Sequence, residues 1–210
     1  MRNDPNLQKT SRTGGAVLGP LLVGMLLLGG CEAPEVIGPT QPSSALSADA
    51  SAATASASGG GQFFGQFFFG VPVKFGFIAI QRDPSGDAFG SYHFSTVVDG
   101  QTIKIHGRVS CMTTDPANPN RAWIGGVITK NDSEHPLYTG PTSQVGRDAW
   151  FRVVDYGEGD NASQPDRASF IFFEPTGGFT SARAFCDAQL WFPEDRLTNP
   201  VLQGNIQVRQ

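Results

Sequence analysis

Alternation of apolar and polar residues, repeated along the second two thirds of the chain, most constrains what this sequence can fold into. The alternating runs are separated by stretches rich in Gly, Pro, Asn and Asp, which favour turns. No window shows a convincing 3.6-residue period. Seven or eight strands at this spacing predict an all-β, single antiparallel domain, either a small barrel or a two-sheet sandwich. The runs are Val71–Phe77, Tyr92–Val98, Ile103–Val109, Ala122–Ile128, Ala149–Val153, Ala168–Phe172, Ala182–Cys186 and Ile206–Val208.

The aromatic residues restrict where this domain lies. No phenylalanine, tryptophan or tyrosine precedes Phe63, and residues 32–61 consist mainly of Ala, Ser, Pro and Gly. Such a composition cannot bury enough apolar surface to fold and predicts a flexible linker. We therefore expect the β-domain to span residues 62–210. The stretch Phe63–Phe69 (FFGQFFF) is too apolar to be exposed, which predicts an extra edge strand or a contact site for a partner.

The N-terminus has the order of elements of a secretory signal. Basic residues up to Arg12 precede an apolar run, Ala16–Leu28, whose 13 residues are too few to span a ~30 Å hydrocarbon core as a helix. The run ends at Leu28-Gly29-Gly30-Cys31, which resembles the lipobox of bacterial lipoproteins. This resemblance implies a signal peptide over residues 1–30 and lipidation of Cys31. The alternative is an ordinary signal peptide with an incidental cysteine.

Lipidation at Cys31 implies a membrane as partner and a location in the cell envelope. Glu32 stands where lipoproteins retained in the inner membrane have Asp, so the resemblance favours the outer membrane. The formal net charge of −4 provides no basic surface of the kind that nucleic-acid-binding proteins carry.

Two cysteines remain in the domain, Cys111 and Cys186. Export would place them in an oxidising compartment, where two cysteines in one domain usually pair. On the predicted strands Cys111 shares a face with Val109 and Cys186 shares a face with Ala184, so both sulfurs should point into the core. A structural disulfide is expected. Two inert buried thiols are the alternative, and the lack of a C-x-x-C pair argues against redox chemistry.

Catalysis has little support in the sequence. It contains no G-x-S-x-G, H-E-x-x-H, phosphate-binding or dinucleotide-binding motif. Scattered Asp and Glu residues leave open an exported carboxylate-dependent hydrolase, because glycosidases need only two such groups in one cleft. We expect neither a catalytic residue nor a cofactor.

Two groups of residues are candidate metal ligands. The first is the acidic loop with Asp155, Glu158, Asp160, Asn161 and Asp166, whose oxygens could hold Ca²⁺, although the spacing is not that of an EF-hand. A solvated turn explains the same composition. Either metal group would make the chain a metal-binding envelope protein.

The second group depends on the register of one hairpin. Asp99-Gly100 between two alternating runs predicts a two-residue type I′ turn, which places His93 opposite His106 and Tyr92 opposite Gly107. This register also sorts the apolar and polar side chains onto separate faces. Two facing imidazoles could chelate Zn²⁺ or Cu²⁺, with His135 as a third ligand. Two ordinary surface histidines are the favoured alternative, because Lys104 and Arg108 would repel a cation.

The later part of the chain, about residues 90–210, resembles a family of uncharacterised bacterial secreted proteins. The shared motifs are Gly107-x-Val109-x-Cys111, AWIGGVIT at 122–129, VVDYGEG at 153–159, Cys186 and GNIQV at 204–208. Tyr156 departs from the family pattern, which has Asn at that position. The resemblance implies a domain boundary but no activity. Taken together, these features favour a lipid-anchored, non-enzymatic β-domain that has a binding or structural role toward a protein or polymer of the envelope.

Overall fold

A computed structural model describes residues 54–65, 70–158, 162–191 and 195–210. The strands are β1 (Ala55–Phe64), β2 (Pro72–Gln81), β3 (Ala88–Val98), β4 (Gln101–Asp115), β5 (Asn118–Asn131), β6 (Asp148–Val154), β7 (Arg167–Ala168), β8 (Phe172–Phe173) and β9 (Asn199–Arg209). The helices are α1 (Ala182–Ala188) and the 3₁₀ turns η1 (Pro136–Tyr138), η2 (Pro141–Ser143) and η4 (Thr176–Gly178). No helix in these ranges has the length and apolar character needed to cross a membrane.

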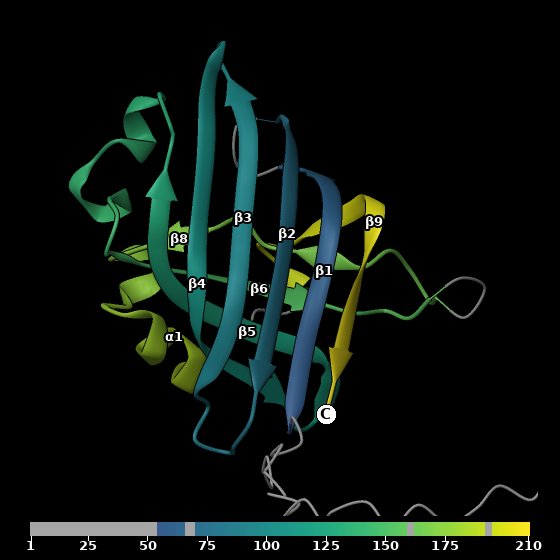
Figure 1. The fold of residues 1–210 in the computed structure, drawn as a ribbon. Coiled ribbons are helices and arrows are strands. Elements are labelled where there is room, and N and C mark those ends of the chain that lie inside the picture. The colour runs from purple at the N-terminus through teal and green to yellow at the C-terminus, as the bar shows by residue number, and fades with distance from the viewer. Residues whose placement is uncertain (1–53, 66–69, 159–161, 192–194) are drawn as a thin grey trace, which may run out of the picture. The chain divides into compact units, whose positions relative to one another are not determined.

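The strands form a closed antiparallel barrel. Their order is β5-β4-β3-β2-β1-β9-β7-β6, and pairing of β5 with β6 closes the ring, while β8 adds to β6 as an extra strand. Figure 1 shows β1 to β4 side by side as one broad wall, with β6 behind them. The prediction of an all-β antiparallel domain is confirmed, and of its two alternatives the structure is the barrel.

The β3–β4 hairpin has the predicted register. Asp99 and Gly100 have φ of 49° and 77°, as a type I′ turn requires. His93 lies opposite His106, and Tyr92 lies opposite Gly107. A Cβ on Gly107 would come within 1.9 Å of the Tyr92 ring, so only glycine allows the ring to lie across β4.

The barrel interior is filled by aromatic and branched side chains. Phe94 lies near its centre, with ring centroids 5.2 Å from Phe151 and 6.3 Å from both Phe75 and Phe170. The buried residues of this core come from all eight barrel strands, from the turns and from the β7–β8 connection. The barrel therefore encloses a packed core.

A second apolar cluster lies outside the barrel, between its wall and α1. It contains the buried residues Cys111, Trp123, Trp150, Ala182, Phe185 and Cys186. A β-bulge between Val109 and Cys111 leaves Ser110 as the extra residue and reverses the alternation along β4. As a result Met112 joins the interior core while Cys111 points outward. The expectation that Cys111 shares a face with Val109 is therefore wrong.

The run Ala182–Cys186 is a helix rather than the predicted strand. Its buried residues Ala182, Phe185 and Cys186 follow the spacing i, i+3, i+4 of a helix face. Ser181 caps the N-terminus by accepting a hydrogen bond from the backbone N–H of Ala184 at 3.1 Å. The alternation of Ala182, Ala184 and Cys186 was misleading because small residues fit either structure.

Two further boundaries differ from the prediction. Strand β1 begins at Ala55, so the domain starts earlier than residue 62 and the predicted linker of residues 32–61 is too long. Small residues form a strand here because β1 runs closely between β2 and β9, where a Cβ on Gly59 would lie 2.7 Å from the Asn205 carbonyl oxygen. Phe63 is buried in β1 as an interior strand, and residues 66–69 lie outside the described ranges. The predicted run Ala168–Phe172 is split into β7 and β8.

Candidate functional site

An apolar pocket lies outside the barrel between β6, α1 and the segment that leads to β9. Its volume is about 110 Å³. For comparison, an apolar cavity of ~150 Å³ holds a benzene molecule. The lining residues are Trp150, Arg152, Phe172, Thr176, Gly177, Phe179, Phe185, Leu190 and Leu197.

Three aromatic rings form one wall. Trp150 stacks on Phe185 with ring centroids 5.8 Å apart, and Phe179 meets both rings edge-on at 6.2 and 5.4 Å. Such contacts are worth roughly 0.5–1.5 kcal/mol each beyond the burial of area, so this wall is formed before any ligand arrives.

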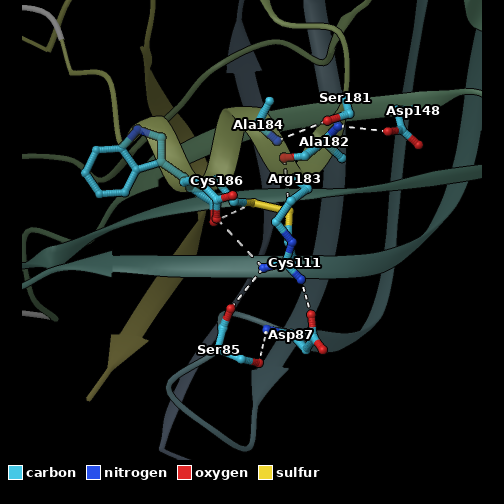
Figure 2. Close-up of a disulfide and its surroundings, with 11 residues drawn as sticks. Ser85, Asp87, Cys111, Asp148, Ser181, Ala182, Arg183, Ala184 and Cys186 are labelled. Atoms are coloured by element: carbon cyan, nitrogen blue, oxygen red, sulfur yellow. Dashed lines mark hydrogen bonds and ion pairs between the residues drawn. A yellow bond between two sulfur atoms is a disulfide. The ribbon is translucent and has the colours of Figure 1, made fainter.

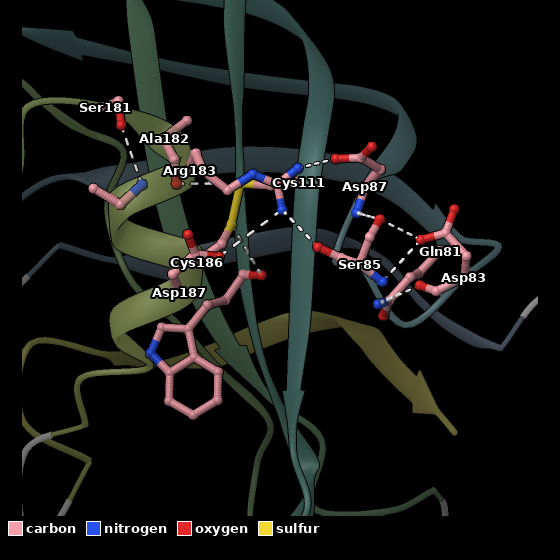
Figure 3. A network of polar contacts seen from close by, with 12 residues as sticks. Gln81, Asp83, Ser85, Asp87, Cys111, Ser181, Ala182, Arg183, Cys186 and Asp187 are labelled. Atoms are coloured by element: carbon pink, nitrogen blue, oxygen red, sulfur yellow. Dashed lines mark hydrogen bonds and ion pairs between the residues drawn. A yellow bond between two sulfur atoms is a disulfide. The ribbon is translucent and has the colours of Figure 1, made fainter.

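The position of α1 is fixed by covalent and polar contacts. Cys111 of β4 and Cys186 of α1 form a disulfide with a Cα–Cα distance of 6.3 Å, as predicted (Figure 2). The Asp148 carboxylate accepts a hydrogen bond at 2.9 Å from the backbone N–H of Ala182. Arg183 reaches the β2–β3 connection, where it donates to the Ser85 carbonyl at 3.2 Å and pairs with the Asp87 carboxylate (Figure 3). The helix is therefore anchored to β4, to β6 and to this connection.

The opposite wall is held by the Arg152 guanidinium. Arg152 is buried, and its two terminal nitrogens donate to the carbonyls of Leu190 at 3.0 Å and Arg196 at 2.6 Å. Burial lowers the pKa of Arg152 to about 10. Trp191 lies within reach of two guanidinium groups, 4.9 Å from Arg152 and 4.7 Å from Arg121. These contacts fix the backbone that carries Leu190 and Leu197.

Asp195 completes this wall as a shared acceptor. Its carboxylate accepts hydrogen bonds from Arg121 at 3.0 Å, from the Trp191 indole at 2.7 Å and from the Tyr156 hydroxyl. Burial alone would raise the pKa of Asp195, but these hydrogen bonds and the Arg121 charge outweigh it, so the pKa lies below its usual value. Burial and the same carboxylate raise the pKa of Tyr156 to about 12.

The backbone of this wall is strained. Gln189, Asp195 and Leu197 have φ of 46°, 52° and 64°. Among the described residues only Asp99 is another non-glycine residue with positive φ. Left-handed conformations of such residues cost on the order of 1–3 kcal/mol each and cluster at ligand-binding sites. Leu197, a bulky residue for which this conformation is unusual, lines the pocket itself.

The lining has the chemistry of a binding site. Apart from Thr176 and Arg152, every lining residue is apolar or glycine, and both terminal nitrogens of Arg152 already donate to backbone carbonyls. The walls therefore offer dispersion contacts and aromatic faces to a small apolar group. They offer no pair of groups for proton transfer.

The acidic loop that was predicted as a candidate calcium site forms hydrogen bonds to β9. Each carboxylate of Asp155 and Asp166 bridges two backbone N–H groups. Asp166 accepts from Tyr156 at 2.8 Å and Ile206 at 2.7 Å, and Asp155 accepts from Gly157 at 2.8 Å and Val208 at 2.9 Å.

Glu158, which belongs to the same acidic loop, accepts hydrogen bonds from the side chains of Asn205 and Gln207 on β9. Burial raises the pKa of Asp166, helped by the charges of Asp155 and Glu158, although its two backbone hydrogen bonds act in the opposite sense. Asp160 and Asn161, the other predicted calcium ligands, lie outside the described ranges. The three carboxylates that the structure describes are used to hold β9.

The histidines are divided between two places. His93 and His106 face each other with ring centroids 6.0 Å apart. Burial, then the charges of His93, Lys104 and Lys130, lower the pKa of His106. His135 is buried and caps η1, where its Nδ1 accepts the backbone N–H of Leu137 at 3.3 Å. Within the described ranges no three His, Cys, Asp or Glu side chains are grouped as a metal site. Cys31 lies outside these ranges.

Comparisons of the chain with protein-family models, with curated proteins and with solved structures found no match. The candidate site therefore depends on its own geometry. Sequence reasoning missed the pocket because its residues come from separate segments between Trp150 and Leu197. The density of phenylalanine around Gly177-Gly178 was the one signal that pointed there.

Proposed function

We propose that this chain is a lipid-anchored, non-enzymatic binding protein of the bacterial cell envelope. The signal peptide over residues 1–30 is removed, Cys31 carries the lipid, and the following residues connect it to the barrel. The observation that supports the anchor is the placement of Leu28-Gly29-Gly30-Cys31 where the apolar run stops. Glu32 supports the outer membrane as its site.

The bound molecule is a small apolar or aromatic group that enters the pocket beside α1. Preformed aromatic walls, a fixed α1 and a strained Leu197 support this role, because they keep open a pocket that side chains would otherwise fill. No observation on the described residues favours the hydrolase or the metal-binding alternative.

Intact mass tests the anchor. Protein extracted from the membrane fraction should lack residues 1–30 and carry the added mass of a diacylglyceryl group. A Cys31→Ala variant should remain unprocessed at this site. A mature chain cleaved elsewhere, without lipid, would overturn the anchoring part of the proposal.

Toluene titration followed by NMR tests the pocket. Saturable shifts should appear at Leu197 and Phe179 in the extracted protein. Thr176→Phe should weaken binding at least tenfold because a phenyl ring would fill the pocket. Thr180→Phe is the matched control, since Thr180 is exposed and does not line the pocket. Equal toluene affinity in the two variants, or no saturation in the wild type, would overturn the binding part.

A further inference from the structure

The outer surface of the β1–β4 wall carries unpaired positive charge. Strand alternation directs Lys74, Lys104 and Arg108 outward, and all three are exposed. None of them takes part in an ion pair within the described ranges. Lys130 on β5 lies opposite His106 of β4 and is paired with Asp132 at 2.6 Å. We call this outward surface of β1–β4 the cationic wall.

Carboxylates are nearly excluded from these strands. The only acidic residue on β1–β4 is Asp115, the last residue of β4, which lies 3.9 Å from Arg121. The whole chain has a formal net charge of −4, so its negative charge is concentrated elsewhere. This segregation makes the wall complementary to an anionic surface.

Large apolar side chains are exposed on the same wall. Phe64, Ile78, Phe89 and Val97 expose 42%, 45%, 41% and 57% of their surface. The strand register places Phe64 and Val97 on either side of Pro72 at one end of the wall, whereas Ile78 and Phe89 lie toward the other end. Lys74 and Lys104 lie between the two apolar ends.

We propose that the cationic wall docks on a lipid bilayer that contains anionic phospholipids. Lys74, Lys104 and Arg108 contact the phosphate groups, and the four exposed apolar side chains enter the boundary between headgroups and acyl chains. These apolar side chains favour a bilayer over a hydrated anionic polymer, which would leave them in water. That a membrane is close to the domain depends on the proposed anchor at Cys31. The charge and the apolar side chains of the cationic wall do not depend on that anchor.

The stacked histidines lie in the middle of the cationic wall. His93 lies over Gly76 of β2, where a Cβ would be 2.4 Å from the ring, and His106 lies opposite on β4. The charged groups around them are Lys104, Lys130 and Asp132. Burial and the nearby cations lower the pKa of His106, so acidification through that lowered pKa adds positive charge here and makes docking tighter. Replacement of both histidines by Gln should remove this pH dependence.

Depth-dependent quenching tests the docking. The intact mass of protein from the membrane fraction is first measured to establish whether Cys31 is lipidated. A fluorescent label is then attached at Ser91→Cys, an exposed position on β3. Vesicles contain quencher lipid in phosphatidylcholine, with or without phosphatidylglycerol. We expect quenching with phosphatidylglycerol only. The control label is Thr180→Cys, which is exposed on the α1 side and should stay unquenched.

Charge reversal provides the matched variants. Lys104→Glu/Arg108→Glu should weaken docking by about tenfold or more, since each cation near an anionic surface contributes on the order of a factor of five. Arg147→Glu/Arg196→Glu reverses two exposed cations away from the wall and should change docking less than about twofold.

Three results would overturn the proposal. The first is equal quenching of the Ser91 label on both kinds of vesicle, and the second is an equal loss of docking in the two charge-reversal variants. The third is displacement of the protein from vesicles by dextran sulfate whose concentration of negative charge is lower than that of the lipid. The last result would assign the wall to a soluble polymer. If the mass shows no lipid on Cys31, the anchor fails, but co-flotation and quenching still test docking directly.

Discussion

The two parts of this barrel are closed by different means. Strands β1 to β5 pair through long backbone ladders, such as the ten residue pairs between β1 and β2. Strands β7 and β8 have two residues each, and side chains replace the missing ladder. Asp166 and Asp155 accept the N–H groups of Ile206 and Val208 on β9. We call these two parts the ladder half (β1–β5) and the latched half (residues 148–210).

This difference shows how a barrel can close without eight long strands. The N–H groups of β9 need acceptors whether or not a neighbouring strand supplies them, because unpaired buried backbone groups are costly. Carboxylates on a short loop supply those acceptors. The connection from β8 to β9 is thereby free to form α1 and the pocket wall.

Loss of the disulfide should have the largest effect on stability, and this effect should fall first on the latched half. The bridged cysteines are 75 residues apart. In the chain-entropy model, a disulfide that closes a loop of this length stabilises the folded state by at most about 4.5 kcal/mol. In Cys111→Ser/Cys186→Ser, hydrogen exchange should lose protection first in α1 and the segment before β9, with β2 to β4 protected longest. Uniform loss of protection across both halves would contradict the distinction.

Removal of one latch should come next. Asp166→Ala leaves the N–H groups of Tyr156 and Ile206 without their acceptor, and we expect a loss of about 2–4 kcal/mol in the free energy of unfolding. Asp166→Asn keeps one acceptor oxygen and should lose less. Urea denaturation measures both variants. An Ala variant as stable as the wild type would mean that β9 needs no latch.

A packing change in the ladder half should be smaller. Gly107→Ala places a Cβ 1.9 Å from the Tyr92 ring, and overpacking of this kind costs typically about 1–3 kcal/mol. Tyr92→Leu in the Gly107→Ala background should restore part of that loss, although Tyr92→Leu alone destabilises. Additive losses in the thermal unfolding of the double variant would contradict direct contact between these residues.

Acid sensitivity of the latched half should be the smallest effect. The folded pKa of Asp195 lies below its unfolded value of about 3.9, so the charged carboxylate stabilises the fold above pH ~4. This stabilisation is lost as the pH falls through the folded pKa. Asp195→Asn should therefore be less stable at neutral pH and less sensitive to acid. Parallel stability curves of variant and wild type from neutral pH to pH ~3 would contradict this prediction.

Sequence reasoning was most successful in the ladder half. Alternation and the Asp99-Gly100 turn predicted the β3–β4 register residue by residue, because both depend only on neighbours in the chain. The pairing of Cys111 with Cys186 was also predicted, although the faces assigned to both cysteines were wrong. The bulge at Ser110 could not be predicted, because the alternation of apolar and polar residues continues through it in the sequence.

The latched half was less predictable for a physical reason. The Asp155–Asp166 loop has the composition of a solvated turn or a calcium site, and its actual partners are backbone groups of β9, about 40 to 50 residues away. Likewise Ala55–Gly61 has the composition of a linker and becomes a strand because β2 and β9 lie on both sides of it. Tertiary contacts determine such segments.

The pairing of β1 with β9 has a consequence for the order of events as the protein is made. Ser56 lies opposite Arg209, so the first and last strands of the barrel are neighbours. Until the C-terminal residues have left the ribosome, β1 lacks one of its two partners and the ring stays open. Such first-to-last closure is slow because the ends must meet across the whole intervening chain. The proposed export of this chain would benefit from that delay, since a chain that has not finished folding can still pass through a translocation pore.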